Sequence, residues 1–509
     1  MLSVVNTGPS PPCPAPFNLA AHVLAPATQT PEKIALAVLG SAGAERWSFG
    51  RLSEAVLGVA GALERKGHSP GARVLLHLGN TVEFPIAFLG AVAAGMVPVP
   101  VSSQLTPAEI DDVLTQIVPA MIFADPALPM PATQTPIVDL AGLAAWHTHP
   151  PGTPRLGNPE RPGYIVFTSG TSGRPRAVVH AHRAIWARGM MREGWYGLTA
   201  EDRVLHAGAF NWTYTLGTGL MDPWAAGATA LIPGPGVTPA QLPLLMRRHD
   251  ATIFAAAPGV YRQMLKPDVP LSLPKLRHGL AAGEKLPDTL RAAWTRHTGT
   301  PIYEAFGMSE CSTFLSGSPA RPAPDGTLGY PQTGRHIAVL DAQGAPTSRG
   351  KQGTLAVHRS DPGLMLGYLG RAAETQTRYA GDWFQTGDLV VMQDDGAIAY
   401  LGRDDDMMNA GGYRVSPLEV EAALTEHPQI SEAAAVEVTV KADTTVIAAF
   451  YTAQNELDPN ALSAHMSDRI ARYKTPRLYI HVDTLPTSAN GKLARQHLRR
   501  TYEARNDQT

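Results

Sequence analysis

Segments with helical spacing alternate with short apolar segments along the N-terminal part of the chain. In residues 52–66 apolar side chains recur at helical intervals, and Gly67 follows as a stop. We predict next a strand over 73–78, a helix over 84–95, a strand over 97–101, and a helix with Thr106 as its cap and Pro107 as its first residue. This alternation predicts an α/β fold with a largely parallel sheet.

The pattern changes along the rest of the chain. Residues 126–162 are rich in proline and polar residues, and we predict a surface loop there. A strand over 164–167, a strand over 252–257 and a helix over 286–298 continue the α/β pattern. From about residue 327 short strands alternate with turns, at 337–340, 353–358 and 397–401. The tail contains a helix over 417–426 and strands over 433–440 and 445–451.

A chain of 509 residues is too long for one ordinary core. We therefore expect a flexible N-terminal arm over residues 1–16. A large α/β domain with a β-rich subdomain would follow over 17–403, and a small α+β domain over 404–509.

Composition argues against several classes of function. The 42 Lys and Arg residues nearly balance the 44 Asp and Glu residues, so nucleic acid is not expected as a partner. Two cysteines, Cys13 and Cys311, argue against a disulfide framework and a cysteine-built metal site. No run approaches the ~18 apolar residues of a membrane span, and residues 1–16 lack the regions of a signal peptide. We expect a cytoplasmic setting without membrane contact.

The segment Tyr164–Arg176 places a strand before a loop with four hydroxyl side chains and two glycines. Glycines let backbone N–H groups surround phosphate oxygens, hydroxyls add donors, and Arg176 adds positive charge. The spacing is not the Gly-x4-Gly-Lys-Ser/Thr loop of the common nucleotide hydrolases. A flexible Gly/Ser surface loop is the alternative interpretation.

Two further segments suit a nucleotide. In Tyr303–Glu310 an aromatic residue beside a glycine can stack on a base, and Ser309 and Glu310 suit a phosphate and its Mg²⁺. In Trp383–Leu389 the carboxylate of Asp388 follows a Thr-Gly turn and suits the two hydroxyls of a ribose. A buried turn and an ordinary Asx-type turn are the respective alternatives.

Two segments nearer the C-terminus suit a moving part. Residues 401–414 join charged side chains to paired glycines where the pattern changes, as a hinge would, although a charged linker would look similar. In Leu485–Leu493 the single Lys492 follows a glycine, and a mobile ammonium there could stabilise developing charge at a carboxylate–phosphate centre. A solvated surface lysine is the alternative.

In their order and spacing these five segments resemble the adenylate-forming (AMP-binding) superfamily, in its acyl- or aryl-CoA ligase branch. Residues 47–100 and Arg472–Arg477 extend the resemblance over nearly the whole chain. The resemblance implies a large N-terminal domain and a small C-terminal lid. It also implies that a carboxylate attacks the α-phosphate of MgATP, giving acyl-adenylate and pyrophosphate, after which the lid rotates and a thiol attacks the adenylate.

The resemblance assigns roles by position. The β- and γ-phosphates would be held by Thr168, Ser169, Gly170, Thr171, Ser172 and Gly173, with Arg176 nearby. Adenine would be surrounded by Gly283, Glu284, Glu304, Ala305 and Phe306. The α-phosphate, Mg²⁺ and ribose would be bound by Ser309, by Glu310, and by Asp388 with Arg403. Lys492 would orient the reacting groups, Asp405 would be the hinge, and the pantetheine tunnel would be lined by Gly411 and Gly412. The implied catalytic set is Lys492, Arg403 and Glu310.

The chain departs from the family pattern at two places. Arg176-Ala177 stands where the family usually has Lys-Gly, and an arginine fork is not interchangeable with an ammonium. We expect altered phosphate handling there, with function retained. Ser309 stands where a threonine is usual and keeps the hydroxyl.

The acyl pocket is predicted to include Trp212, Tyr214, Ala281, Gly307 and Met308. Family members that activate amino acids place an Asp near the start of residues 210–217, but here the next acid is Asp222, so an α-amino acid is not expected. The two aromatics favour a short-chain or aromatic acid, and the run Phe314–Ser316 resembles benzoate-type ligases. Plain core packing of the aromatics is the alternative.

The expected partners are a small carboxylic acid, ATP with Mg²⁺, and coenzyme A. Only 17 residues follow Lys492, too few for a carrier-protein segment, which favours free coenzyme A as the thiol. Two alternatives stay open: a stand-alone adenylation enzyme that loads a separate carrier protein, and a nucleotide-binding regulator with a degenerate site. A homodimer is one option for the oligomeric state.

Overall fold

The computed structural model describes residues 1–6, 8, 11–40, 43–168, 175–404, 406–410, 413–441, 444–467, 469–470, 474–487 and 493–506. The chain forms two compact units. The larger unit comprises Val5–Ile337 and Val357–Phe384. The smaller unit comprises Met1–Val4, Ala338–Ala356 and Gln385–Thr509.

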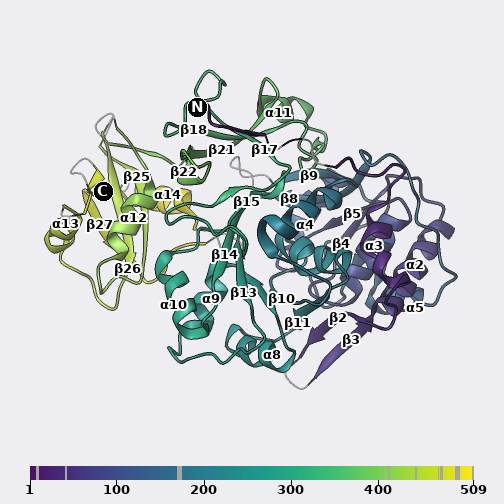
Figure 1. Ribbon diagram of the computed structural model, residues 1–509. Coiled ribbons are helices and arrows are strands. Elements are labelled where there is room, and N and C mark those ends of the chain that lie inside the picture. Colours follow the sequence, from purple (N-terminus) through teal and green to yellow (C-terminus); the bar gives the residue numbers. More distant parts are fainter. Residues whose placement is uncertain are drawn as a thin grey trace. The chain divides into compact units, whose positions relative to one another are not determined.

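A mostly parallel sheet forms the centre of the larger unit (Figure 1). Its strands follow the order β16 (Tyr330–Pro331), β15 (Ser312–Ser316), β14 (Ile302–Met308), β13 (His278–Ala282), β12 (Ile253–Ala256), β10 (Arg203–Ala207), β11 (Thr229–Pro233), β2 (Ile34–Leu39) and β3 (Ala44–Ser48). Neighbours from β14 to β2 run parallel, and the pairs at the two ends are antiparallel. This order confirms the predicted α/β class with a largely parallel sheet.

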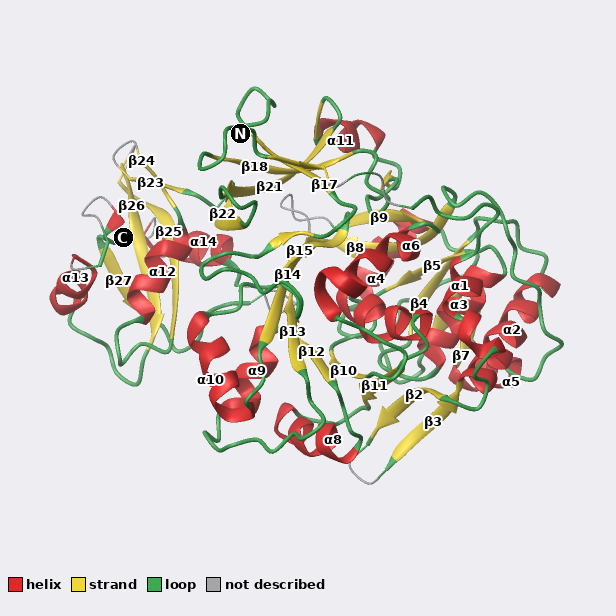
Figure 2. Ribbon diagram, viewed as in Figure 1, coloured by secondary structure: helices red, strands yellow, loops and turns green. Residues whose placement is uncertain are grey.

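The two faces of this sheet are covered by different helices. On one face Phe254 of β12 packs with Tyr261 of α9 (Pro258–Leu265) and Trp294 of α10 (Asp288–Thr298), beside α8 (Leu242–Arg248) (Figure 2). On the other face Ile253 packs with Tyr214 and with the π-helix η3 (Arg192–Tyr196). Since successive strand residues point to opposite faces, β12 is buried on both sides and reads as an unbroken apolar run.

A second parallel sheet follows the order β5 (Val97–Pro100), β4 (Arg73–His77), β6 (Met121–Ala124) and β7 (Ile137–Asp139). Beside it lie α2 (Phe49–Arg65), α3 (Glu83–Ala93) and α5 (Leu140–Trp146) (Figure 1). The predicted start of α4 (Pro107–Ile117) is confirmed: Thr106 caps it and forms a capping box with Glu109. A small antiparallel sheet contains β8 (Pro162–Thr168), β9 (Arg176–Ala181) and β19 (Gly367–Tyr368).

The remaining short elements of the larger unit connect these sheets. They are α1 (Leu19–Val23), η1 (Ala25–Thr28), α6 (Ala184–Ala187), η2 (Arg188–Met190), η4 (Thr215–Met221), α7 (Asp222–Ala225), η5 (Pro239–Gln241) and α11 (Ala372–Thr377).

Another sheet follows the order β1 (Val4–Asn6), β17 (His336–Leu340), β18 (Gln352–His358), β21 (Trp383–Met392) and β20 (Tyr379–Ala380), with β22 (Ile398–Arg403) paired to β21. This sheet confirms the predicted β-rich subdomain. The C-terminal part of the smaller unit has strands β23 (Met408–Ala410), β24 (Tyr413–Val415), β25 (Glu432–Lys441), β26 (Thr444–Thr452) and β27 (Leu478–His481). Its helices are α12 (Pro417–Thr425), α13 (Pro459–Ser467) and α14 (Arg495–Asn506), as expected for an α+β tail.

Three local predictions were wrong. The loop expected over 126–162 contains β7 and α5, whose first turn is capped by the Asp139 carboxylate accepting from the Gly142 N–H at 2.8 Å. Part of the expected flexible arm, Val4–Asn6, is strand β1. The Thr-Gly turn expected before Asp388 lies inside β21, where Gly387 takes a positive φ of 81° and the register against β22 shifts between Leu389 and Val390. Pairing of β7 with β6 and of β21 with β22 outweighed the local turn signals, whereas α5 follows from its own cap.

Candidate active site

The predicted phosphate loop lies between two hydrogen-bonded strands. Thr168 ends β8 and stands opposite Arg176, the first residue of β9. Of the loop residues, Ser169, Gly170, Thr171, Ser172 and Gly173 lie outside the described residues. The pairing of β8 with β9 places the two described ends of the loop, Thr168 and Arg176, side by side.

Arg176 is engaged by other side chains of the larger unit. Its Nε donates to Glu374 Oε1 at 2.5 Å, and its guanidinium carbon lies 5.4 Å from the ring centroid of Tyr368. Glu374 also accepts from Arg371 Nη1 at 3.3 Å. These contacts direct the guanidinium toward α11 and β19. The contact of Arg176 with phosphate stays a prediction.

The Ser309–Glu310 turn is held from three directions. Met365 donates its N–H to the Glu310 carbonyl at 2.7 Å, and the Tyr368 hydroxyl donates to Glu310 Oε1 at 2.7 Å. His180 of β9 donates from Nε2 to the Ser309 carbonyl at 2.7 Å. Burial lowers the pKa of His180 to about 4, so the ring is neutral at pH 7 and its proton lies on Nε2. Two strands of one small sheet thus fix both residues of the turn.

Glu310 suits a magnesium ion. It is a nearly buried carboxylate, and hard divalent cations take carboxylate oxygens, with one or two carboxylates and substrate phosphates being the usual Mg²⁺ set. Oε1 accepts from Tyr368, and among the described residues none donates a hydrogen bond to Oε2. The donor present therefore fits the ion that the predicted reaction requires.

The predicted adenine and acyl residues meet where β13 and β14 end. Gly283 has a positive φ of 97°, and a Cβ on it would lie 2.5 Å from Cζ2 of Trp212. Trp212 stands edge-on to Tyr214, with ring centroids 5.4 Å apart. The Tyr214 hydroxyl donates to the Leu280 carbonyl of β13 at 3.0 Å. Glycine is required at 283 because the indole occupies the space of a side chain.

Neighbouring strands bring the remaining predicted residues of this group together. Ala281 pairs with Glu304, and Ala282 pairs with Ala305, across β13 and β14. The register of β14 against β15 shifts between Phe306 and Gly307, and the described chain continues through Met308 into the Ser309–Glu310 turn. A Cβ on Gly307 would lie 2.2 Å from the Ser312 carbonyl oxygen, so this position also requires glycine.

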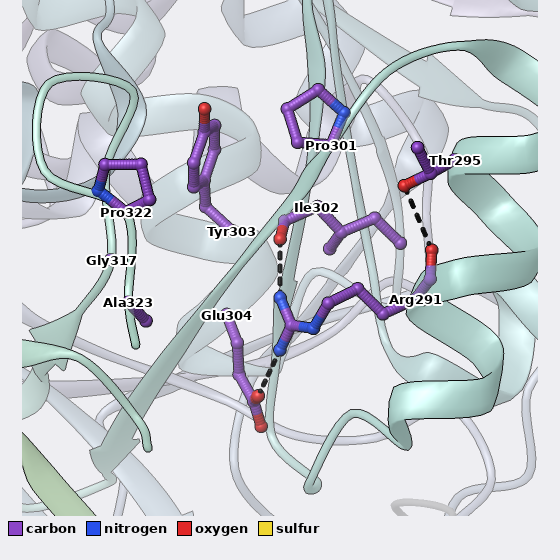
Figure 3. A pocket seen from close by; sticks show the side chains of 9 residues that line it. All are labelled: Arg291, Thr295, Pro301, Ile302, Tyr303, Glu304, Gly317, Pro322 and Ala323. Carbon is purple, nitrogen blue, oxygen red and sulfur yellow. Dashed lines mark hydrogen bonds and ion pairs between the residues drawn. The ribbon is translucent and has the colours of Figure 1, made fainter. Parts of the chain in front are cut away.

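The carboxylate of Glu304, a predicted adenine residue, is bound by two donors of the larger unit. It accepts from the Leu286 N–H at 2.9 Å and from Arg291 Nη2 of α10 at 3.0 Å. Burial raises its pKa, and these two donors offset part of the rise. Figure 3 shows Arg291 reaching toward Glu304 and the Ile302 carbonyl at a pocket of about 170 Å³ that includes Tyr303. That volume is below the roughly 300–1,000 Å³ typical of ligand sites.

Sequence reasoning missed a buried charged network next to the predicted acyl pocket. Arg188 donates from Nε and Nη2 to the two carboxylate oxygens of Asp222 at 2.8 and 2.6 Å. Tyr196 donates its hydroxyl to Asp222 at 2.6 Å, and Arg188 also donates to Ser312, two residues after Glu310. Asp222 is visible in the sequence as a lone acid after an apolar segment, which could have suggested a paired carboxylate. Nothing near it in the chain indicated that Arg188 would be its partner.

His206 was also missed. It lies at the end of β10, fully buried, with its ring centroid 4.4 Å from that of Tyr214. Burial, with the Arg188 charge as a second cause, lowers its pKa to about 3. Among the described residues neither ring nitrogen has a hydrogen-bond partner.

In the smaller unit the two predicted ribose residues stand opposite each other. Asp388 of β21 pairs in register with Arg403 of β22, and Arg403 Nη1 lies 3.6 Å from Asp388 Oδ2. Tyr400 donates its hydroxyl to Asp388 Oδ1 at 3.2 Å, and Arg403 donates to the Thr386 carbonyl at 3.1 Å. The structure therefore brings this predicted pair together on adjacent strands.

The moving parts predicted from sequence are Asp405, Gly411, Gly412 and Lys492, and all four lie outside the described residues. The described flanks are anchored. Arg495 of α14 donates to both carboxylate oxygens of Glu421 at 2.9 and 2.7 Å and lies 3.6 Å from Asp406 Oδ2. The stretch just after Lys492 and the stretch just after Asp405 are thereby tied to the same arginine.

The class of protein follows from three features: the central parallel sheet, the glycines at its strand ends, and the Ser309–Glu310 turn beside it. The chain belongs to the AMP-binding enzyme family: the family model matches residues 24–369, and that of the AMP-binding enzyme C-terminal domain matches residues 419–492. It is 31% identical to the benzoate–CoA ligase of Thauera aromatica, over 85% of this chain and 86% of that protein. It is 30% identical to the 4-hydroxybenzoate–CoA/benzoate–CoA ligase of Rhodopseudomonas palustris, over 89% and 88% of the two chains.

Solved structures agree with this assignment. An anthranilate CoA ligase in complex with anthranoyl-AMP superposes with a TM-score of 0.87 at 25% identity, covering 97% of this chain and 99% of that one. A benzoate CoA ligase from Burkholderia xenovorans LB400 superposes with a TM-score of 0.83 at 28% identity, covering 95% and 100%. In the part of the chain that the structure describes, no helix has the length and apolar character to cross a membrane.

Proposed function

We propose that this protein is an ATP-dependent ligase that joins an aromatic carboxylic acid to coenzyme A. The observation that carries the proposal is the aromatic wall of Trp212 and Tyr214, packed at Gly283 on the strand ends of a chain whose matched relatives include benzoate–CoA ligases. Acid–thiol ligation with release of AMP is the activity of these relatives and of this chain. A short-chain acid is the second candidate, since Acyl-coenzyme A synthetases also match.

The buried network supports an acid without an α-ammonium group. Asp222 is the first carboxylate after the predicted acyl segment, and Arg188 and Tyr196 already occupy both of its oxygens. Because Asp222 is buried and its charge is compensated by Arg188, it is a poor partner for a substrate ammonium.

The reaction has two halves. In the first, the acid's carboxylate oxygen attacks the α-phosphorus of ATP and pyrophosphate leaves. In the second, the thiol sulfur of coenzyme A attacks the acyl carbon and AMP leaves. Positioning and charge neutralisation supply most of the catalysis in such phosphoryl chemistry, and a closed site protects the adenylate from water.

We assign the residues of the first half-reaction as follows. Thr168 and the loop to Gly173 would hold the β- and γ-phosphates, and Ser309 would contact the α-phosphate. Glu310 would hold Mg²⁺, which when bound supplies positive charge to the phosphates. Gly283, Glu284, Glu304, Ala305 and Phe306 would surround adenine. The orientation of the Glu304 carboxylate toward Arg291 favours contact through its backbone.

We assign the remaining roles to the smaller unit and its flanks. Asp388 and Arg403 would bind ribose, and Lys492 would orient the carboxylate in the first half-reaction. Rotation at Asp405 would exchange Lys492 for a tunnel lined by Gly411 and Gly412. This assignment keeps a domain over 17–403 and a lid over 404–509, preceded by residues 1–16, of which Val4–Asn6 form strand β1. We also propose a cytoplasmic location without nucleic-acid or membrane partners. A homodimer is one option for the oligomeric state.

A panel of carboxylic acids tests the proposal. Pyrophosphate release is measured for benzoate, its hydroxy and amino derivatives, and short aliphatic acids, each with and without coenzyme A. We expect an aromatic acid to give pyrophosphate, and AMP release to require coenzyme A. AMP release that requires an added carrier protein would favour the stand-alone adenylation enzyme. No pyrophosphate with any acid, despite ATP binding, would favour the regulator.

A further inference from the structure

We propose that Tyr368 is a positioning residue for Glu310, and that Arg176 acts through Tyr368 and Glu374 without contacting phosphate. The inference rests on the proposed function, because it concerns the residue assigned to the metal ion. It goes beyond that function by giving Arg176, the odd residue of the phosphate segment, a different task.

The contact between Tyr368 and Glu310 is short and nearly buried. The phenol hydroxyl donates to Oε1 at 2.7 Å, and the two residues are 4% and 9% exposed. A hydrogen bond to a carboxylate at this distance is charge-assisted and stronger than one between neutral groups. It fixes the carboxylate torsion of Glu310, so that Oε2 keeps one direction. Preorganising a ligand in this way removes part of the entropy cost of ion binding.

Tyr368 is itself held at its backbone. It pairs with Val178 across β19 and β9, and its N–H donates to Thr375 Oγ1 of α11 at 3.0 Å. The next residue, Leu369, donates its N–H to the carbonyl of Ala177 at 2.9 Å. Ala177 is buried in a hydrophobic cluster with Ile165, so its methyl group has a packing role where the family pattern has glycine.

Arg176 packs over the ring of Tyr368. The guanidinium lies over the phenol ring at 5.4 Å, a distance at which a cation attracts the ring face. Its Nε is committed to Glu374 at 2.5 Å, and Glu374 is fixed in turn by Arg371. A lysine ammonium has no planar face to lay on a ring while it pairs with a carboxylate, which accounts for arginine at this position.

Two kinds of substitution separate this role from phosphate binding. Tyr368→Phe removes the hydroxyl and keeps the ring under Arg176. Arg176→Lys keeps the positive charge and loses the planar guanidinium that lies over the Tyr368 ring. Tyr379→Phe is the matched control, because Tyr379 lies nearby in β20 with its ring against Phe384 and carries no bond to Glu310.

The measurement is Mn²⁺ binding to each protein in the presence of a non-hydrolysable ATP analogue, followed by electron paramagnetic resonance. It needs neither the acid nor coenzyme A. We expect Tyr368→Phe to weaken Mn²⁺ binding about two- to tenfold, the cost of ordering one freed side chain on binding. Arg176→Lys should show a smaller change in the same direction, and Tyr379→Phe none. The KM for the acid should not change in any of the three.

Other results would overturn the inference. Unchanged Mn²⁺ binding in Tyr368→Phe, with the wild-type protein binding the ion, would refute the positioning role alone. If Arg176→Lys raises the KM for ATP at saturating metal and leaves Mn²⁺ binding unchanged, Arg176 contacts the phosphates of ATP. Failure of the wild-type protein to bind Mn²⁺ with nucleotide would remove the proposed function together with the inference. Thermal melting of each variant identifies any loss that comes from misfolding.

Discussion

The Arg188–Asp222 pair allows a quantitative prediction. Asp222→Asn keeps the shape of the side chain and leaves the guanidinium of Arg188 buried without its counter-charge. Removing one partner of a buried ion pair costs about 3–5 kcal/mol. The larger unit has roughly 360 residues, and an unfolding entropy of about 2.1 cal/mol/K per residue gives it roughly 0.76 kcal/mol/K. The expected fall in its melting temperature is therefore about 4–7 °C.

Differential scanning calorimetry of the ligand-free protein measures this change. Asp382→Asn in the exposed pair with Arg359 is the control, because its side chains are 49% and 64% exposed and such pairs contribute about 0–1 kcal/mol. The double variant Arg188→Met with Asp222→Leu should recover most of the loss, since apolar replacement of a buried pair is often close to neutral. A melting temperature within 1–2 °C of wild type for Asp222→Asn, on the scale of about 1 kcal/mol, would refute the reasoning.

Three further predictions concern the site. Lys492→Ala should abolish acyl-adenylate formation yet spare thioester formation from supplied acyl-AMP, and unchanged ATP–pyrophosphate exchange in it would contradict the role given to Lys492. Gly283→Ala should lower pyrophosphate release, because the positive φ costs about 1–2 kcal/mol and the added Cβ meets Trp212 at 2.5 Å. Adding Trp212→Leu to Gly283→Ala should relieve the clash but not the backbone strain. Equal activity of Gly283→Ala and wild type would show that the end of β13 tolerates a side chain. The pKa of His206 is about 3 in the folded protein and about 6.5 unfolded, so its stabilising contribution is full above pH 6.5 and is lost as the pH falls toward 3. His206→Leu should reduce the slope of the free energy of unfolding against pH by at most about 1.4 kcal/mol per pH unit in that window. Urea titrations measure this slope, and an unchanged slope would mean that the folded ring is protonated.

Much of the fold could be predicted because its signals are local. Helical spacing in α2, the cap and proline of α4 and the apolar run of β12 all act within a few residues, and the structure confirms each of them. The order of the five segments was likewise visible along the chain, and the family match confirms the class that it implied. The resemblance also assigned the glycines at 283 and 307 to the site.

What the glycines touch, and where charged side chains point, depended on packing between residues far apart in the chain. Arg176 meets Glu374 across 198 positions, and Glu310 meets Tyr368 across 58. Glu304 on β14 accepts a hydrogen bond from Arg291 of α10, and this contact decides where its carboxylate points. The sequence alone thus determined the class of enzyme and the order of its elements, because spacing and backbone preference are properties of short segments. Tertiary structure alone decided which carboxylates remain available for a ligand, because ion pairing depends on distance in space.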